Sequence, residues 1–160
     1  VVAGGGDACM HACGLGYLAQ HPLFDQIPDL RKDIATPDYC HMCGEGELQS
    51  INAWFGPAGT VSPLHTDPHQ NLLAQAVGYK YVRLYSPSCS AALHPHGEGM
   101  HSNSSQVDLR RPDPVKFPGA AEAPFFDTVL GPGEMLYIPR GWWHYVQAMS
   151  PSFSVSFWWQ

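Results

Sequence analysis

The sequence predicts an all-β domain with a closed or double-sheet fold, such as a jelly roll. Fifteen prolines, sixteen glycines and 12% aromatic residues favour short strands joined by tight turns over long helices. Short β-like runs follow one another from about residue 50 to the end of the chain. One long polar segment, residues 87–124, interrupts these runs and reads as an insertion between strands.

The expected strands are short apolar runs that end at turn residues. The turn signals GPAG, VGYK, LGPGE, IPRGW and SPS separate them. The strands are expected at residues 50–55, 61–66, 70–77, 79–85, 126–130, 134–138, 143–149 and 152–159.

The remaining segments carry weaker patterns. Residues 1–16 are rich in Gly and Ala and form a lead-in with little pattern, so a single domain is expected over residues 17–160. Residues 17–34 are expected to be extended chain with a short helical turn, because Pro22 and Pro28 break any long helix. Residues 37–49, PDYCHMCGEGELQ, are expected to form a loop. An insertion as long as 87–124 is expected to be functional or partly disordered.

Composition argues against several classes of protein. The net charge is −6, and the 8 Lys and Arg residues form no run, which argues against autonomous nucleic-acid binding. No apolar stretch approaches the roughly 20 residues that cross a bilayer, so no membrane partner is expected. The first residues make a poor signal peptide and lack an initiator Met, so we expect a piece of a longer protein. The odd number of cysteines favours reduced thiols inside the cell; they are Cys9, Cys13, Cys40, Cys43 and Cys89.

The triplet His65-Thr66-Asp67 is the first candidate site. Residues i and i+2 of a strand project from the same face, so His65 and Asp67 can point together into the interior of a barrel. His144 follows a second pair of strand-like runs. Two histidines and one carboxylate form the facial triad suited to non-haem Fe(II). Taken singly, the triplet is also typical of a polar turn, and His144 of a hydrogen-bonded core histidine.

Three other residues are candidates for lining the same cavity. Lys80 shares a strand face with Val82 and Leu84, so it either meets a buried anion or lies at a sheet edge with its amine in water. Asn71 either lines the cavity or simply starts its strand. In the C-terminal FSVSFWWQ, one alternating face is evenly apolar, and the other ends in Trp158, which fits a cavity wall or a surface position.

Two further clusters have competing interpretations. CHMC (Cys40 to Cys43) and CMHAC (Cys9 to Cys13) could together hold zinc, or could be reduced loop thiols. His94, His96 and His101 lie in the polar insertion and are expected to stay solvated. The sequence has no G-x-S-x-G elbow, P-loop or G-x-G-x-x-G, which leaves little support for serine hydrolases, NTPases or dinucleotide enzymes.

Longer motifs carry a family resemblance over residues 16–160. They are INAWFGPAGTVSPLHTDPHQNLLAQAVGYKYVRLYSP, SNSSQVD, PGEMLYIPRGWWHYV and SFSVSFWW. They resemble the JmjC domain of Fe(II)/2-oxoglutarate oxygenases. The resemblance implies a double-stranded β-helix, the cupin-like jelly roll of that family, with few short helices. It also implies Fe(II), with 2-oxoglutarate and O2 as cosubstrates. The implied iron ligands are His65, Asp67 and His144, and the implied 2-oxoglutarate pocket contains Tyr17, Ser62, Asn71, Lys80 and Trp158.

The resemblance implies a dioxygenase that hydroxylates a protein side chain, arginyl in the most similar members. The alternatives are N-methyl-lysine demethylation of histone tails, histone-tail cleavage, or a non-catalytic binding module. An intact triad together with Lys80 argues against the binding module. The expected partner is a protein or peptide bearing Arg or Lys, which an acidic chain attracts. The nucleus is the expected location by resemblance, with the cytoplasm as the alternative.

Overall fold

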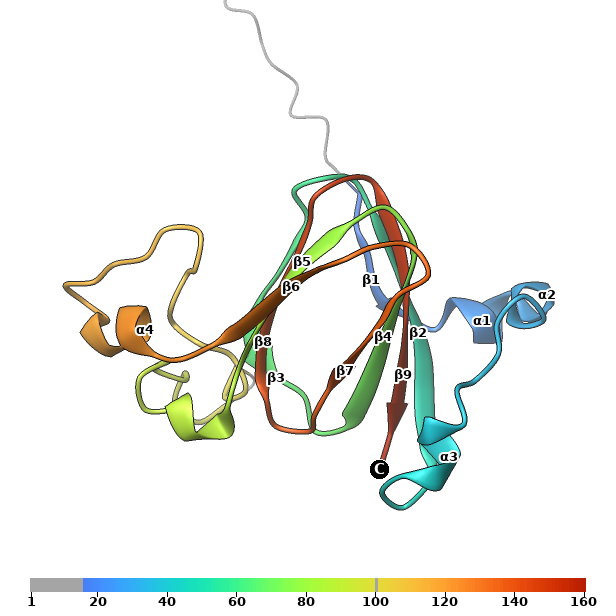
Figure 1. Ribbon diagram of the computed structural model, residues 1–160, viewed down its shortest axis with the longest axis horizontal. Helices are drawn as coiled ribbons and strands as arrows, with labels where there is room; N and C mark the ends of the chain where they lie inside the picture. Colours follow the sequence, from blue (N-terminus) through green and yellow to red (C-terminus); the bar gives the residue numbers. More distant parts are fainter. Residues whose placement is uncertain (1–15, 100) are drawn as a thin grey trace, which may run out of the picture.

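Two antiparallel β-sheets face each other in the computed structural model, which describes residues 16–99 and 101–160 (Figure 1). The larger sheet has the order β1 (Leu18–His21), β2 (Leu48–Gly56), β9 (Ser152–Trp159), β4 (Gln70–Val77), β7 (Met135–Ile138). The smaller has the order β3 (Val61–Thr66), β8 (Trp143–Ala148), β5 (Lys80–Tyr85), β6 (Phe126–Leu130). The predicted all-β, double-sheet fold is confirmed, and the eight expected strands correspond to β2 through β9 within two residues at each end.

Strand β9 is the centre of the larger sheet and shows the predicted alternation. It pairs with β2 on one side and with β4 on the other. Ser154 and Ser156 are fully buried on the face that looks toward the smaller sheet. On the opposite face, Phe157 and its alternating neighbours join a cluster of buried apolar side chains outside the sandwich, which contains Phe24, Cys40, Ala53, Leu72, Val155, Phe157 and Trp159.

Three short helices cover that outer face of the larger sheet (Figure 1). They are α1 (Leu23–Gln26), α2 (Pro28–Arg31) and α3 (Tyr39–Met42). One expectation was wrong here. Residues 39–42 form a helix rather than a loop, because the fully buried Cys40 packs in the outer cluster. The extended chain expected in residues 17–34 is confirmed at β1, which lies along the edge of β2, where Leu18 pairs with Phe55.

The long insertion covers the outer face of the smaller sheet, on the opposite side of the molecule (Figure 1). It contains a 3-10 turn, η1 (Pro87–Cys89), and a helix, α4 (Pro118–Glu122). Buried apolar side chains of the insertion pack against the sheet in one cluster: Cys89, Leu93 and Ala123 against Leu64, Tyr85, Trp143 and Tyr145. The insertion is therefore a packed layer in its described residues.

The space between the two sheets is only partly apolar. A third cluster fills one part of it and contains Leu73, Val82, Leu84, Leu130, Ile138 and Val146. The polar side chains described below occupy the other part. None of the helices in the described residues is long and apolar enough to cross a membrane.

The outer cluster generates a stability prediction. Phe157 is 2% exposed and Phe126 is 69% exposed. Phe157→Ala should lower the free energy of unfolding by about 3–5 kcal/mol, because it removes a buried ring and leaves a cavity. Phe126→Ala, the matched control, should change it by about 0.5 kcal/mol or less. Urea denaturation of both variants measures the difference, and equal losses would contradict the assignment of the core.

Candidate functional site

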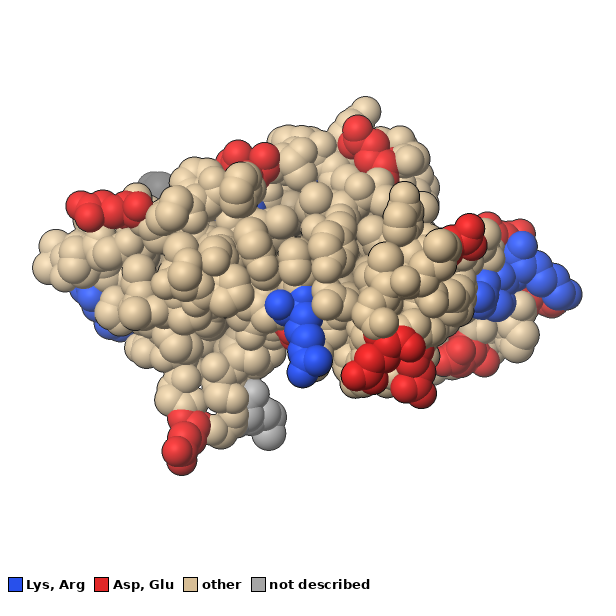
Figure 2. Space-filling model, turned by 60° about the horizontal axis from the view of Figure 1, so that its bottom comes forward, with Lys and Arg blue, Asp and Glu red and all other residues tan. Residues whose placement is uncertain are grey.

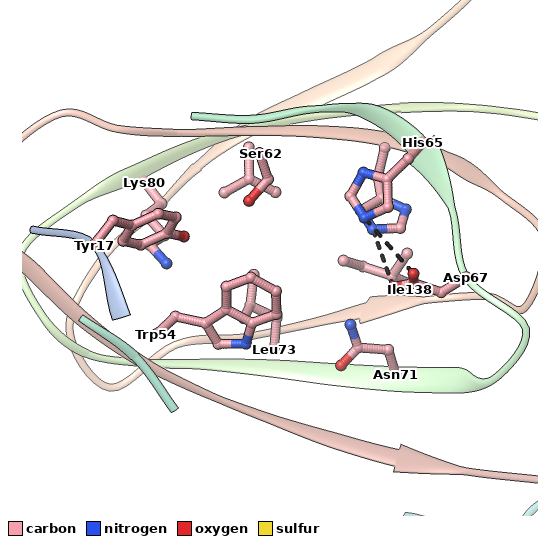
Figure 3. A pocket seen from close by; sticks show the side chains of 11 residues that line it. Tyr17, Trp54, Ser62, His65, Asp67, Asn71, Leu73, Lys80 and Ile138 are labelled. Atoms are coloured by element: carbon pink, nitrogen blue, oxygen red, sulfur yellow. Dashed lines mark ion pairs between the residues drawn. The ribbon is translucent and has the colours of Figure 1, made fainter. Parts of the chain in front are cut away.

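His65, Asp67 and His144 converge at one end of the space between the sheets (Figure 3). Strands β3 and β8 bring the histidines together, since His65 pairs directly with His144 in the antiparallel register. Their ring centroids are 4.2 Å apart. Asp67 follows the end of β3, where its carbonyl accepts a hydrogen bond from Gly141 N–H at 3.0 Å. One possible ligand atom from each of the three side chains lies within 4.8 Å of the others.

The two histidine rings are oriented with Nε2 toward the Asp67 carboxylate, an arrangement that favours a bound cation. His65 Nδ1 lies 2.6 Å from the Pro63 carbonyl, and His144 Nδ1 lies 3.1 Å from the Trp142 carbonyl. A carbonyl only accepts hydrogen bonds, so in each neutral ring the proton is on Nδ1 and the lone pair is on Nε2. His65 Nε2 lies 3.6 Å and His144 Nε2 lies 3.3 Å from the Asp67 carboxylate. The lone pair of a neutral ring therefore faces an anion, and a cation between the two groups relieves the repulsion.

Burial sets the charge of two of these groups. Burial, with the nearby charge of His144, lowers the pKa of His65 from 6.5 to about 4. Burial alone would raise the pKa of Asp67, but contact with His144 and the nearby histidine charges outweigh it and leave that pKa below its ordinary value. At neutral pH the centre therefore offers a neutral imidazole and a carboxylate, the protonation states in which both bind metals.

A narrow cavity of about 30 Å³ extends from the three residues between the sheets (Figure 3). His65 and Asp67 lie at one end, Tyr17 and Lys80 lie at the other, and Ser62 lies between them. The lining side chains come from both sheets: Tyr17, Trp54, Ser62, Asn71, Leu73, Lys80, Ile138 and Val146, with His65, Asp67 and His144. The cavity thus has a carboxylate end and a cationic end.

Lys80 is the cation of that second end. It is 2% exposed, and its strand β5 lies between β8 and β6, so the alternative of a sheet-edge lysine with its amine in water is wrong. Among the described residues, no carboxylate lies within ion-pair distance of Lys80. Its Nζ lies 5.9 Å from the centre of the Trp54 ring. Burial lowers the pKa of Lys80 from 10.5 to about 8. An unpaired buried ammonium is costly, and an anionic ligand would compensate it.

Tyr17 reaches the cavity because its neighbour Gly56 has no side chain. A Cβ on Gly56 would lie 2.7 Å from Tyr17 Cδ2, closer than van der Waals contact allows. Burial raises the pKa of the Tyr17 hydroxyl, and a hydrogen bond with Ser62 partly opposes that rise. Tyr17 therefore stays protonated at neutral pH and can donate a hydrogen bond beside Lys80.

Asn71 and Trp158 differ in how they relate to the cavity. Asn71 lines it and is 5% exposed, and its side-chain oxygen has no hydrogen-bond partner in residues 16–99 and 101–160. Trp158 pairs with Asn71 across β4 and β9 and is 8% exposed, but it is not among the residues that line the cavity. The centre of its ring lies 5.6 Å from that of His69, and its indole N–H likewise has no hydrogen-bond partner among those residues. Its predicted contact with a cosubstrate stays a prediction.

Sequence reasoning missed Trp54. Its ring lines the cavity beneath Lys80, and its indole N–H donates to Ser156 Oγ at 2.9 Å, which ties β2 to β9. Trp54 stands between Ala53 and Phe55 in an apolar run, so the sequence does not distinguish an inward from an outward ring. Asn52 lies two residues earlier, on the same strand face, and is 5% exposed. A polar residue at that position is the one sequence signal that this face lines a polar interior.

The other metal candidates do not assemble in the described residues. His65, Asp67 and His144 form the one group there that could hold an ion. Cys40 is buried while Cys43 is exposed. Cys9 and Cys13 lie outside the described residues, so the zinc hypothesis stays open. His96 and His101 are exposed, as expected, and His94 packs against Phe117.

The donor set suits the metal that the resemblance implies. Two imidazole nitrogens and one carboxylate oxygen on one side of an ion leave its opposite side open, as in non-haem Fe(II) centres. The Nδ1–H contacts with backbone carbonyls hold both rings in the orientation for binding, as is usual for metal-bound histidines. The Asn71 side-chain oxygen and the Lys80 amine, which lack partners among the described residues, can both form hydrogen bonds with a ligand in the cavity.

Comparison with known proteins identifies the family. A sequence model of a protein family, described as the cupin-like domain, matches residues 8–160. The chain is 63% identical over 143 residues to "Lysine-specific demethylase JMJ30" of Arabidopsis thaliana, covering 89% of this chain and 33% of that protein. It is 57% identical over 148 residues to "Lysine-specific demethylase 8" of Danio rerio (91% and 36%). It is 48% identical over 146 residues to "Jumonji C domain-containing protein 5" of Drosophila melanogaster (90% and 36%).

The chain thus spans about a third of the length of these relatives. The match to the cupin-like model covers nearly all of the described residues, and the relatives align over the same stretch that carries the His-Asp-His centre. The chain belongs to the cupin-like JmjC-domain family.

Proposed function

We propose that this domain is an Fe(II)- and 2-oxoglutarate-dependent dioxygenase that acts on a protein side chain. The observation that carries the proposal is the pairing of two complementary ends in one cavity. A centre of His65, Asp67 and His144 that suits a cation lies at one end. The buried Lys80, which has no carboxylate partner within the described part of the chain, lies at the other. A dicarboxylate that bridges a metal ion and an ammonium satisfies both ends at once.

Each residue has a role in this proposal. His65, Asp67 and His144 hold Fe(II), which supplies the oxygen-activating chemistry when bound. Lys80, Tyr17 and Ser62 bind the far carboxylate of 2-oxoglutarate by charge-assisted hydrogen bonds. Asn71 lines the pocket with its free amide oxygen, and Trp158 supports it from the neighbouring strand.

We propose an arginyl side chain as the substrate. The alternative is an N-methyl-lysine, which the names of the Arabidopsis and zebrafish relatives favour. Both substrates are cationic, and the net charge of −6 favours either over nucleic acid. An intracellular location, the nucleus included, stays a prediction. On the face shown in Figure 2, acidic side chains form several separate groups at the margin, and basic side chains lie near the middle and at both ends, so the preference for a cationic peptide rests on net charge.

Mass spectrometry of candidate peptides after turnover separates the two substrates. Arginyl hydroxylation adds the mass of one oxygen atom to the peptide, whereas demethylation removes a methyl group. An oxygen added to an arginine-bearing peptide supports the first proposal. Loss of methyl from an N-methyl-lysine peptide, with arginine untouched, would favour the alternative. Cleavage of the peptide would contradict both.

Removal of one metal ligand should abolish both metal binding and turnover. His65→Ala leaves two ligands, which are too few to hold the ion, so we expect metal affinity to fall at least about 100-fold. His41→Ala removes an exposed histidine on α3 and is the matched control. Calorimetric titration with Mn(II) measures affinity, and succinate release measures turnover. Normal turnover by His65→Ala would show that the centre is assigned wrongly.

Lys80→Met should stabilise the protein while it abolishes 2-oxoglutarate binding. The buried ammonium has no carboxylate partner among the described residues. Its lowered pKa corresponds to a cost of about 3 kcal/mol at pH 7, which Met does not carry. Lys32→Met, at a side chain that is 77% exposed, is the control and should change neither property. Urea denaturation and cosubstrate titration test both effects. A destabilised Lys80→Met variant that still binds 2-oxoglutarate would contradict the role of Lys80.

The same lysine predicts a pH dependence. The folded pKa of Lys80 lies below 10.5, so its cost to stability is fully present below pH about 8 and fades as the pH rises toward 10.5. Cosubstrate binding needs the charged amine, so 2-oxoglutarate affinity should fall as the pH rises above about 8. A titration series from pH 7 to pH 9.5 measures this, and a flat affinity profile would count against Lys80 as the carboxylate partner.

A further inference from the structure

A short segment of the long insertion runs along the outer edge of β3, the strand that carries His65. Strand β3 is at the edge of the smaller sheet and has β8 on only one side. On its other side, Ser104 lies opposite His65 in an isolated antiparallel bridge. Ser105 N–H donates to the Leu64 carbonyl at 2.9 Å. Residues 103–105 therefore cover the edge of β3 through an isolated β-bridge beside the proposed metal ligands.

Within this segment, Asn103 binds both backbone groups of Thr66, the residue between His65 and Asp67. Thr66 N–H donates to the Asn103 carbonyl at 2.8 Å. The Asn103 side-chain amide donates to the Thr66 carbonyl at 2.9 Å. The two peptide planes around Thr66 carry the two ligand residues, so fixing both restricts where those side chains point.

On the side away from β3, another part of the same insertion, residues 94–96, binds this segment. The Ser104 carbonyl accepts a hydrogen bond from His96 N–H at 2.8 Å, and Gln106 N–H donates to the His94 carbonyl at 2.9 Å. Leu93, next to His94, is fully buried in the cluster that anchors the insertion. Residues 103–105 thus lie between β3 and residues 94–96, and their position is fixed by packing on both sides.

We infer that Asn103 is a positioning residue for the metal ligands, so that the insertion controls metal affinity at a centre it does not enter. This inference rests on the proposed function. Metal binding tolerates displacements of only a few tenths of an ångström in its ligands. Loss of the Asn103 amide leaves the Thr66 carbonyl without its partner, and the peptide that leads into Asp67 is then free to rotate.

Asn103→Asp tests the inference, because the new side chain has nearly the same shape but no N–H to donate. Gln106→Glu is a matched control. It makes the same amide-to-carboxylate change in the same insertion, where Gln106 Nε2 donates to the Pro95 carbonyl at 3.2 Å and not to β3. Asn103→Ala removes the donor without adding charge. All three variants are compared with the parent after urea denaturation has shown that they are folded.

We expect Asn103→Asp and Asn103→Ala to bind Co(II) about tenfold more weakly than the parent, with an altered visible d–d spectrum. Gln106→Glu should match the parent in both. The added carboxylate of Asn103→Asp would by itself strengthen cation binding, so weaker binding reports lost geometry. In the metal-free proteins, amide hydrogen exchange at Thr66 should be faster in both Asn103 variants and unchanged in Gln106→Glu.

Two results would overturn the inference in different ways. If the parent binds Co(II) and both Asn103 variants bind it equally well with the same spectrum, Asn103 only covers the strand edge and the proposed function stands. If the parent itself binds no Co(II), the proposed function fails and the inference fails with it.

Discussion

The site depends on one electrostatic conflict, in which the Nε2 lone pair of the neutral His65 ring faces the Asp67 carboxylate. Backbone carbonyls hold His65 and His144 with Nε2 toward Asp67, and burial lowers the pKa of His65 to about 4, so that ring is neutral near pH 7. Direct pairing of β3 with β8 leaves the rings little room to turn away. The protein thus keeps in place a cluster that is unfavourable without a cation, which is a reason to regard it as built for one.

Lys80 presents the opposite conflict at the other end of the same cavity. An ammonium that is 2% exposed and has no carboxylate partner among the described residues lowers stability. The neighbouring Tyr17 and Ser62 are hydroxyl groups, which can donate to an anion but do not neutralise an ammonium. The two ends complement a ligand with a metal-binding group and a carboxylate. In this view the apolar residues between the sheets, among them Leu73 and Ile138, fix the distance between the ends.

Much of this arrangement could be predicted from the sequence, because successive side chains of a strand point to alternate faces of the sheet. His65 and Asp67 share a face by that rule, and FSVSFWW divided correctly into an outer apolar face and an inner face. Trp54 was missed because apolar residues flank it on both sides. Helix α3 was missed because burial of Cys40, a tertiary effect, overrides the local turn signals. The contact of Asn103 with Thr66 joins residues 37 apart through backbone groups, which leave no pattern in side-chain chemistry.

The central claim is that the histidine-carboxylate centre and Lys80 bind one ligand together. Calorimetric titration of 2-oxoglutarate into the protein, with and without Mn(II) as a redox-inert substitute for Fe(II), tests it most directly. The account predicts clear binding with Mn(II) and binding at least about tenfold weaker without it, since the metal supplies one of the two attachment points. Equal affinity with and without the metal, or no binding in either case, would contradict it.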